Sequence, residues 1–409
     1  MNSCPDESLP PTPNVSADGS ARWVVAMSGG VDSSVVAQMM AAEGLDLVGL
    51  FMRNGVEVAE EDVPKKSCCS TGDARDARMV AASMGIPFQA VDLKQEFKRV
   101  IDYFVSEYAK GRTPNPCAVC NRDLKFSRLM AFADELGAEG VATGHYAQVE
   151  IPDSGPDRGR VVVRRGVDEN KDQSYQLFCV AEADLARTRF PLGGMRKPEV
   201  RALAEKMGIR TAKKADSQEI CFVPSGDYRN LLKEHNTKLH SGKIVDTAGK
   251  QLGVHSGTEL FTIGQRRGLG VALGEPMYVV KTIPATGTVV LGTREECGES
   301  TMRFEEANWI GFDPPSSGEF RADVQVRYHH TAAPATIALS GTEAEVVFDE
   351  PQFSLAPGQG GACYLGDRLI GGGWIARHSA SSSASGAASG AASGAASGAT
   401  SGASGSSQR

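Results

Sequence analysis

Residues 28–34 read Ser-Gly-Gly-Val-Asp-Ser-Ser and directly follow the apolar run Trp-Val-Val-Ala at 23–26 and Met27. An apolar run that ends at two glycines before a helix-forming stretch predicts a strand, a tight loop and a helix. In that geometry the loop N–H groups and the helix N-terminus point at one spot, which favours an anion such as a phosphate. The Gly-Lys-Ser/Thr of a Walker loop is absent. The stretch therefore predicts a phosphate-binding loop of another kind.

The chain on either side of this loop alternates strand-like and helix-like segments as far as residue 149. This rhythm predicts an α/β fold with a doubly wound, mostly parallel sheet, whose ligands bind beyond the carboxyl ends of the strands. The expected strands are 23–26, 46–51, 86–91 and 140–143, and the expected helices are 35–43, 73–84, 94–110, 121–136 and 197–208.

After residue 216 the character changes. The Gly-rich part to 273 predicts a small linking domain, and short alternating runs from 277 to Trp374, including 278–282 and 288–291, predict an antiparallel β-barrel or sandwich. The expected division is a disordered leader at 1–20, a catalytic domain at 21–215, a central domain at 216–275, a β-barrel at 276–377 and a Ser/Gly/Ala tail at 378–409.

Composition narrows the class of protein. No apolar run reaches about 18 residues, so no membrane span is expected. Nine cysteines without a secretion signal favour a reducing cytoplasm. Although the net charge is −7, residues 187–214 hold nine Lys/Arg against two Glu. This stretch predicts an RNA-binding surface that includes Arg187, Arg189, Arg196 and Lys197, or else a solvated helix face.

Two cysteine-bearing segments carry further chemistry. The loop 111–121, Gly-Arg-Thr-Pro-Asn-Pro-Cys-Ala-Val-Cys-Asn, is stiffened by its prolines and delivers Cys120 to a helix expected to begin near Asn121. A helix N-terminus, together with Arg122 and Lys125, would favour the nucleophilic thiolate. A zinc knuckle would need a second Cys-x-x-Cys, which the chain lacks. Cys221, between Ile and Phe, is by itself typical of a buried small hydrophobe.

Taken together, the motifs resemble a known family. Ser-Gly-Gly-Val-Asp-Ser is similar to the PP-loop of the ATP pyrophosphatases, and seven motifs in order resemble the tRNA-specific 2-thiouridylases of the MnmA type from about Arg22 to Arg377. They are the loop at 28–33, Thr-Pro-Asn-Pro-x-x-x-Cys-Asn at 113–121, Thr-Gly-His-Tyr at 143–146, Lys-Asp-Gln-Ser-Tyr at 171–175, Ser-Gln-Glu-Ile-Cys-Phe at 217–222, Gly-Gln-Arg-Arg-Gly at 264–268 and Arg-Tyr at 327–328.

The resemblance implies a PP-loop fold and a two-part reaction. ATP adenylylates the C2 oxygen of the wobble uridine in a tRNA anticodon loop, and sulfur carried as a persulfide then displaces AMP. Cys221 would hold the persulfide, and Cys120 would be the nucleophile that ends in a transient disulfide with it. The implied partners are tRNA and a protein that donates persulfide sulfur, and the implied enzyme is a cytoplasmic monomer.

Site residues carry over motif by motif. The ATP-binding positions would be Ala26, Met27, Ser28, Gly29, Gly30, Val31, Asp32, Ser33, Met52 and Gly144, with Mg²⁺ at Asp32. The target base would be bordered by Asn115, Pro116 and Cys117 with His145 nearby, and the tRNA contacts would be Lys171, Asp172, Gln173, Arg327, Tyr328 and Gln359.

One departure and three alternatives remain open. Many family members carry Asp where this chain has Cys117, so the proton-transfer role of that Asp does not carry over. Cys117, Cys120 and Cys221 could instead ligate an iron–sulfur cluster. The other two alternatives are a different PP-loop adenylylating synthetase and a non-catalytic tRNA-binding protein. Elsewhere, the vicinal pair Cys68–Cys69 could be redox-active.

Overall fold

The computed structural model describes most of the chain between residues 20 and 377. The described residues are 20–55, 71–214, 216, 220–223, 227–235, 237–272 and 274–377. The expected leader (except Ser20), the Cys68–Cys69 pair and the tail lie outside them. Among the described helices, none has both the length and the apolar character needed to cross a bilayer.

The N-terminal half contains the expected parallel sheet. Its five strands run in the order β3-β2-β1-β4-β7, and every neighbouring pair is parallel. The strands are β1 Arg22–Ala26, β2 Asp46–Arg53, β3 Phe88–Asp92, β4 Gly140–Ala142 and β7 Thr188–Arg189. The first four confirm strands that the sequence predicts. The two-residue β7 was not predicted, because so short a segment has no periodicity of its own.

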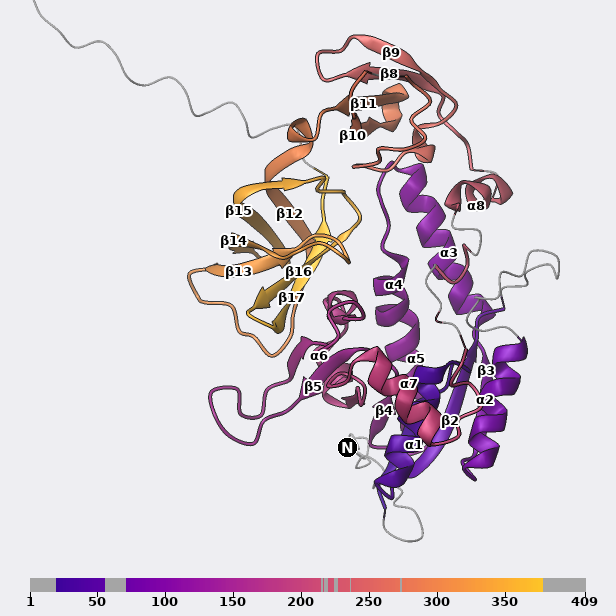
Figure 1. Ribbon diagram of the computed structural model, residues 1–409. Helices are drawn as coiled ribbons and strands as arrows, with labels where there is room; N and C mark the ends of the chain where they lie inside the picture. Colours follow the sequence, from indigo (N-terminus) through magenta and orange to yellow (C-terminus); the bar gives the residue numbers. More distant parts are fainter. Residues whose placement is uncertain are drawn as a thin grey trace, which may run out of the picture. The chain divides into compact units, whose positions relative to one another are not determined.

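Helices cover both faces of this sheet, as Figure 1 shows for its indigo and violet part. Alternate residues of β1 explain why: Trp23 and Val25 enter one apolar core with α1, α2 and α7, whereas Val24 enters another with α5. The helices are α1 Val31–Ala42, α2 Thr71–Ser83, α3 Lys94–Ala109, α5 Ser127–Glu135, α6 Glu182–Ala186, α7 Lys197–Lys206 and α8 Tyr228–Glu234. The doubly wound fold is confirmed.

One predicted helix boundary is wrong. The helix expected at 121–136 begins five residues earlier, as α4 Pro116–Val119, continues as the π-helical η1 Cys120–Phe126 and ends as α5. Asn115 caps it, since its Oδ1 accepts a hydrogen bond from the N–H of Ala118 at 3.2 Å. Asn at the cap followed by proline at the first helical position is a start signal that was present in the sequence.

The middle of the chain forms a separate four-stranded sheet in the order β10-β11-β8-β9. Its strands are β8 Gly242–Asp246, β9 Gln251–His255, β10 Tyr278–Ile283 and β11 Thr288–Gly292. The strands at 278–283 and 288–292 were expected in the C-terminal barrel, but they share a core with Ile244 of β8. Alternation along a strand reveals its buried face and not its partner strand, so this difference was invisible in the sequence.

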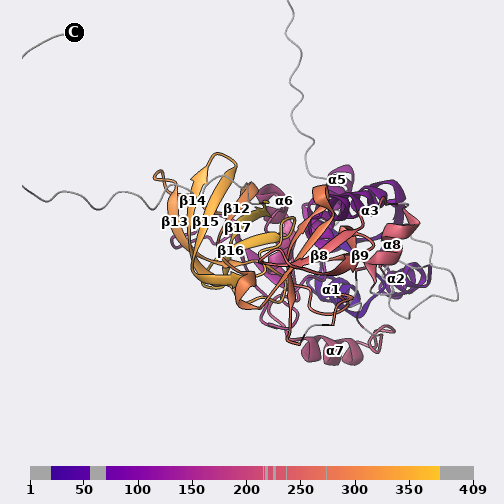
Figure 2. The same cartoon turned by 90° about the horizontal axis from the view of Figure 1, so that it is seen from above.

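Six antiparallel strands then close into a barrel, with β12 pairing both β15 and β17. They are grouped together in the orange and yellow part of Figure 2. The strands are β12 Gly298–Trp309, β13 Glu319–Gln325, β14 Ala333–Ser340, β15 Glu343–Phe353, β16 Gly360–Leu365 and β17 Arg368–Ile375. The predicted C-terminal barrel is confirmed, with its first strand at 298 instead of 278.

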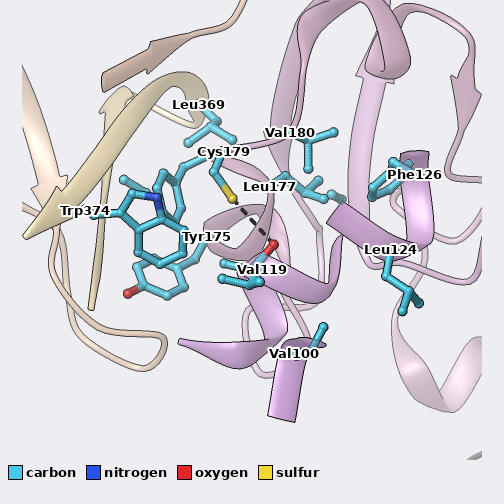
Figure 3. Packing of buried hydrophobic residues seen from close by; sticks show 14 of the residues in the cluster. Val100, Val119, Leu124, Phe126, Tyr175, Leu177, Cys179, Val180, Leu369 and Trp374 are labelled. Atoms are coloured by element: carbon cyan, nitrogen blue, oxygen red, sulfur yellow. Dashed lines mark hydrogen bonds between the residues drawn. The ribbon is translucent and has the colours of Figure 1, made fainter. Parts of the chain in front are cut away.

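A hairpin of the first half extends the barrel sheet. Strands β5 Ala147–Glu150 and β6 Val162–Arg165 pair with each other, and β6 pairs with β17. Trp374 and Leu369 of β17 join the apolar cluster that contains Tyr175 and Cys179, as Figure 3 shows. This shared core fixes the barrel against the region of the cysteine loop, which matters for the site.

Candidate active site

The loop between β1 and α1 has the geometry of an anion site. Gly29 adopts φ +72°, and a Cβ there would lie 2.2 Å from the carbonyl oxygen of Asp73, so only glycine fits. Gly30 is the extended N-cap of α1 and brings no capping side chain. The first N–H groups of α1 are therefore left to a ligand, which is the arrangement that binds phosphate.

A buried lysine lies beside this loop. Lys197, only 7% exposed, donates from Nζ to both carboxylate oxygens of Asp32 at 2.7 Å and approaches Asp216 at 2.9 Å. Tyr146 donates a further hydrogen bond to Asp32 at 2.9 Å. The sequence placed Lys197 in a tRNA-binding surface. Lys197 does not belong to an exposed cationic surface, because its ammonium is buried and paired with two carboxylates.

A second lysine, Lys214, approaches the loop from the segment that follows α7. Lys214 Nζ donates to the carbonyl oxygen of Gly29 at 2.9 Å and pairs with Asp73 at 2.6 Å and Asp76 at 2.8 Å. Burial would lower the pKa of Lys214, but the hydrogen bonds to these two carboxylates outweigh it and raise that pKa. Lys214 is thus a firmly charged cation at the loop. Sequence reasoning missed this role, although Lys214 stands just before the Asp-Ser-Gln-Glu motif.

Two other cations of the 187–214 stretch form ion pairs within the chain. Arg187 pairs with Asp134 at 2.7 Å, and Arg189 pairs with Glu43 at 3.0 Å while its guanidinium lies over the Trp23 ring. A guanidinium already paired with a carboxylate releases few counterions on meeting a phosphate. Two members of the predicted RNA surface, Arg187 and Arg189, are therefore paired within the chain, and the role of this stretch in RNA binding stays a prediction.

Two further predicted ATP-binding residues lie near the loop. Ala26 pairs with Leu50, which places Met52 at the same sheet edge as the loop. Met52 also lines a cavity of about 340 Å³ with Leu50, Val91 and Phe132, but no residue of the loop borders this cavity. On the opposite side Gly144 approaches α1 so closely that a Cβ would lie 3.2 Å from the Cβ of Asp32. The structure thus gathers the predicted ATP-binding positions around the loop.

The cysteine loop is clamped by the barrel. The N–H of Thr113 donates to the carbonyl oxygen of Pro357 at 2.7 Å, and Gln359 Nε2 donates to that of Pro114 at 2.9 Å. Burial, the Asp172 carboxylate and the Cys117 thiol together raise the pKa of Tyr328. Two predicted tRNA contacts of the barrel, Gln359 and Tyr328, therefore lie at the loop that carries Cys117.

The early start of the helix changes which thiol lies at the positive end of the helix dipole. Cys117, which is exposed, lies in the first turn of α4, whereas Cys120 lies past that turn and is partly exposed. Since the macrodipole acts within the first turn, the expectation that it activates Cys120 is wrong and the effect falls on Cys117. Arg122, expected beside Cys120, pairs instead with Asp123 at 2.6 Å and Glu306 at 3.2 Å.

Cys120 and Cys221 pack against the same apolar cluster. Phe222 meets the rings of Phe97 and Phe104 on α3 at centroid distances of 5.7 and 5.2 Å, and Cys120 follows α4, which also packs on α3. Two thiols far apart in sequence are thus brought to one core. Cys221 is partly exposed, so it is not the fully buried small hydrophobe that its neighbours Ile and Phe suggest.

Several predicted contact residues are occupied internally. Asp172 accepts hydrogen bonds from Arg165, from the N–H of Gly166 and from Ser174. Lys171 pairs with Asp216 at 2.8 Å. Gln173 accepts a hydrogen bond from the N–H of Tyr146 at 3.0 Å, and Arg327 donates to Ser354. These four side chains hold the elements around the site, and a direct tRNA contact would require them to change partners.

His145 is buried and neutral. Its Nδ1 lies 2.7 Å from Thr143 Oγ1, and its ring packs between Phe126 and Phe190 at 5.6 Å from each. Burial, helped by the charge of Lys125, holds the pKa of His145 well below its usual range. This is the environment of a satisfied polar group at a strand end.

The iron–sulfur alternative needs three thiols around one centre. Among the described side chains, no three from His, Cys, Asp and Glu come together in an arrangement that could hold a metal ion. Cys117, Cys120 and Cys221, all of them described, therefore do not form the ligand set of such a cluster in this conformation.

Comparison with known proteins decides the family. The family model described as "tRNA methyl transferase HUP domain" matches residues 21–225, the "tRNA methyl transferase PRC-barrel domain" matches 229–293 and the "Aminomethyltransferase beta-barrel domain" matches 299–375. A tRNA-specific 2-thiouridylase MnmA from Solibacter usitatus is 46% identical over 366 residues, covering 86% of this chain and 98% of the relative. The chain belongs to the tRNA-specific 2-thiouridylases.

Other relatives agree. The 2-thiouridylase MnmA of Geotalea uraniireducens is 47% identical over 87% of this chain and 94% of its own length, and that of Rhodopirellula baltica is 41% identical over 87% and 96%. The matched ranges also divide the chain where its sheets divide, because β10 and β11 fall within the PRC-barrel match. Membership in the thiouridylase family thus covers all three described sheets.

Proposed function

We propose that the chain uses ATP to convert the wobble uridine of tRNA to 2-thiouridine by adenylylation followed by persulfide sulfur transfer. The observation that carries the proposal is the packing of Cys120 and Cys221 against one core. A synthetase that only adenylylates has no use for this pair, and neither has a protein that only binds tRNA. Membership in the 2-thiouridylase family supports the same reaction.

The first step is activation of the uridine at the phosphate loop. The uridine C2 oxygen attacks the α-phosphorus of ATP, the α–β phosphoanhydride bond breaks, and pyrophosphate leaves. The N-terminus of α1 with Lys197 and Lys214 surrounds the place where negative charge collects. Asp32 would hold Mg²⁺ beside the phosphates once Lys197 gave up one of its two carboxylate oxygens, and the ion would supply neutralisation of the phosphate charge.

The second step transfers sulfur. The Cys120 thiolate attacks the inner sulfur of the Cys221 persulfide, a Cys120–Cys221 disulfide forms, and hydrosulfide leaves. Hydrosulfide adds to C2 of the adenylylated uridine, AMP departs, and 2-thiouridine remains. A thiol reductant then returns two electrons to the disulfide. Because the sulfur arrives as a persulfide, a persulfide-carrying donor protein is required upstream.

The base site has one distinctive group. Asn115 is 5% exposed, its Oδ1 caps α4, and its side-chain amide lies within hydrogen-bonding reach of the Tyr175 hydroxyl. We place the flipped uracil beside Asn115 and Cys117, at the exposed start of the helix. With Cys117 in place of Asp, proton transfer there falls to a thiol or water.

The setting of the reaction follows from its chemistry. Thiol and persulfide intermediates need a reducing compartment, so we place the enzyme in the cytoplasm. We further propose that it acts as a monomer, since each of the two thiols and the phosphate loop comes from the same chain.

The direct test is reconstitution. The purified chain, unmodified tRNA, Mg²⁺-ATP, a persulfide donor and a thiol reductant should yield 2-thiouridine, AMP and pyrophosphate in equal amounts, measured by nucleoside mass spectrometry and phosphate release. Omission of the persulfide donor should remove the 2-thiouridine. Pyrophosphate release without any 2-thiouridine in the complete mixture would favour the other adenylylating synthetases.

A tRNA-binding prediction arises in the middle domain. Arg266 and Arg267 of the Gly-Gln-Arg-Arg-Gly loop are exposed and form no ion pair within the described residues. Gln265 shapes the loop by accepting from the N–H of Thr262 at 3.0 Å and donating to the carbonyl oxygen of Arg267 at 2.8 Å. Replacing both arginines by alanine should lower the slope of log affinity for tRNA against log salt concentration by about 2, one for each phosphate contact.

The matched control is Arg187→Ala, because Arg187 is already paired with Asp134. Its salt slope should equal that of the unsubstituted protein. Filter binding at four salt concentrations measures all three proteins, and equal slopes for the double variant and the control would exclude the loop as a phosphate contact.

A further inference from the structure

A further thiol lies three residues before Cys120 on the same helix. Cys117 is exposed in the first turn of α4, and Cys120 follows directly after that short helix. The proposed reaction leaves Cys120 and Cys221 joined in a disulfide and gives Cys117 no part in reopening it. A Cys-x-x-Cys pair is the arrangement with which disulfide oxidoreductases carry out thiol–disulfide exchange. Cys117 is therefore a thiol placed where it can take part in such an exchange.

The backbone brings the two thiols to one face of the helix. The N–H of Cys120 donates to the carbonyl oxygens of both Cys117 and Pro116. The bond to Cys117 is of the tighter 3₁₀ type, in which side chains three residues apart eclipse each other. Cα atoms three residues apart in a helix are about 5 Å from each other, and a disulfide spans about 4.4–6.8 Å between its Cα atoms. A Cys117–Cys120 disulfide thus needs only a small movement of the first turn, which has the fewest intrahelical bonds.

Contacts on the inner side hold this turn in place. The Oδ1 of Asn115 accepts a hydrogen bond from the N–H of Ala118 at 3.2 Å, and Cys179 donates from Sγ to the carbonyl oxygen of Ala118 at 3.5 Å (Figure 3). Cys179 does not compete in the exchange, because burial raises its pKa to about 12 and keeps it a protonated thiol, which is a poor nucleophile. The nucleophile that this turn presents at the surface is therefore Cys117.

The two cysteines of the reaction are less accessible than Cys117. Cys120 and Cys221 are partly exposed and pack against the apolar cluster, whereas Cys117 is exposed. A dissolved reductant has to bring its own sulfur to the S–S bond, so side chains packed around that bond slow its attack. A thiol on the same turn of helix already lies beside Cys120 and needs no such approach. Exchange with Cys117 would thus move the disulfide to a place that a reductant reaches.

We propose that Cys117 is the resolving thiol that releases Cys221 after each turnover. The Cys117 thiolate attacks Sγ of Cys120, the Cys120–Cys221 bond breaks, a Cys117–Cys120 disulfide forms, and Cys221 leaves as a thiolate that accepts the next persulfide. The exchange involves no net oxidation or reduction, and the thiol reductant of the proposed reaction then returns two electrons to the more exposed disulfide. This relay rests on the proposed function, because it takes the Cys120–Cys221 disulfide as given.

The test maps disulfides in the full chain without tRNA or ATP. The reduced protein receives one equivalent of cysteine persulfide, the remaining thiols are alkylated with N-ethylmaleimide at intervals, and tryptic peptides are analysed by mass spectrometry. Cleavage after Arg112 and Arg122 leaves Cys117 and Cys120 on one peptide. This peptide should lose the mass of two hydrogen atoms while Cys221 becomes alkylated. The closed peptide should exceed the Cys120–Cys221 cross-link roughly tenfold, a ratio that corresponds to about 30 mV between the two disulfides.

Three variants make the test specific. Cys117→Ser should stop the relay at its first disulfide, so the Cys120–Cys221 cross-link should persist, and Cys117→Ala should give the same pattern. Cys221→Ser should form neither disulfide, because it holds no persulfide for Cys120 to attack. Cys179→Ala is the matched control, since it removes a neighbouring thiol that the relay does not use, and its pattern should equal that of the unsubstituted protein.

The contrary outcomes are distinct. If the Cys120–Cys221 cross-link accumulates in the unsubstituted protein and no closed peptide forms, Cys117 does not resolve it. If Cys221→Ser still forms the closed peptide, the Cys117–Cys120 disulfide arises without the relay. If the persulfide produces no disulfide at Cys120 even in Cys117→Ser, the proposed sulfur-transfer step itself fails, and the relay fails with it.

Discussion

Cys221→Ser is expected to reduce 2-thiouridine formation to the uncatalysed background while pyrophosphate release from ATP in the presence of tRNA continues. The hydroxyl keeps the size of the thiol but cannot carry a persulfide, so the sulfur half of the reaction stops and the activation half remains. Both products are measured in one reaction, 2-thiouridine by nucleoside mass spectrometry and pyrophosphate by an enzyme-coupled assay.

Cys120→Ser should share the loss of thiolation and differ in one intermediate. Without its attacking thiol the persulfide on Cys221 is not resolved, so it should accumulate and appear as a mass increase of one sulfur atom on the Cys221 peptide. Cys297→Ala, a buried cysteine of the short turn η5 Glu295–Cys297 outside the site, is the control. Full thiolation by either serine variant would contradict the assignment of that residue.

The parts of this structure that were predictable are those written into local sequence. The phosphate loop, the alternating sheet and the barrel follow from glycine placement and apolar periodicity, which depend on near neighbours. The start of the helix at Pro116 was also readable, because Asn115 and Pro116 form a cap signal. The predicted start was placed at Asn121 because Cys120 was expected to precede the helix.

The sequence could not reveal which residues or strands far apart along the chain contact each other. Lys197 looks like one more cation in a basic stretch, and its role appears only when folding places it between Asp32 and Asp216. The same limit applies to β10 and β11, whose alternation is equally compatible with either sheet. Local patterns thus predict a charged side chain or a strand, and tertiary packing determines which ion pairs or strand pairings it forms.

Lys197→Met tests that packing directly. The substitution keeps the apolar stem and removes the ammonium that faces the phosphates, so the Kd for Mg²⁺-ATP should rise about 100-fold, as for truncation of one partner in a buried charge pair. Isothermal titration calorimetry measures the change. Lys206→Met in the last turn of the same helix is exposed and should bind ATP as the unsubstituted protein does.

The same variant should be more sensitive to acid. Burial raises the pKa of Asp216, but hydrogen bonds from Lys171 and Lys197 outweigh it and lower that pKa in the folded state. The contribution of Asp216 to stability is therefore full above the ordinary Asp value of 3.8 and is lost as pH falls through the lowered value. Removing Lys197 brings the folded pKa back toward 3.8, which shrinks the contribution and moves the acid unfolding midpoint to higher pH. Circular dichroism against pH records the midpoint. Unchanged ATP affinity together with an unchanged midpoint would mean that Lys197 contributes neither to ATP binding nor to the lowered pKa of Asp216.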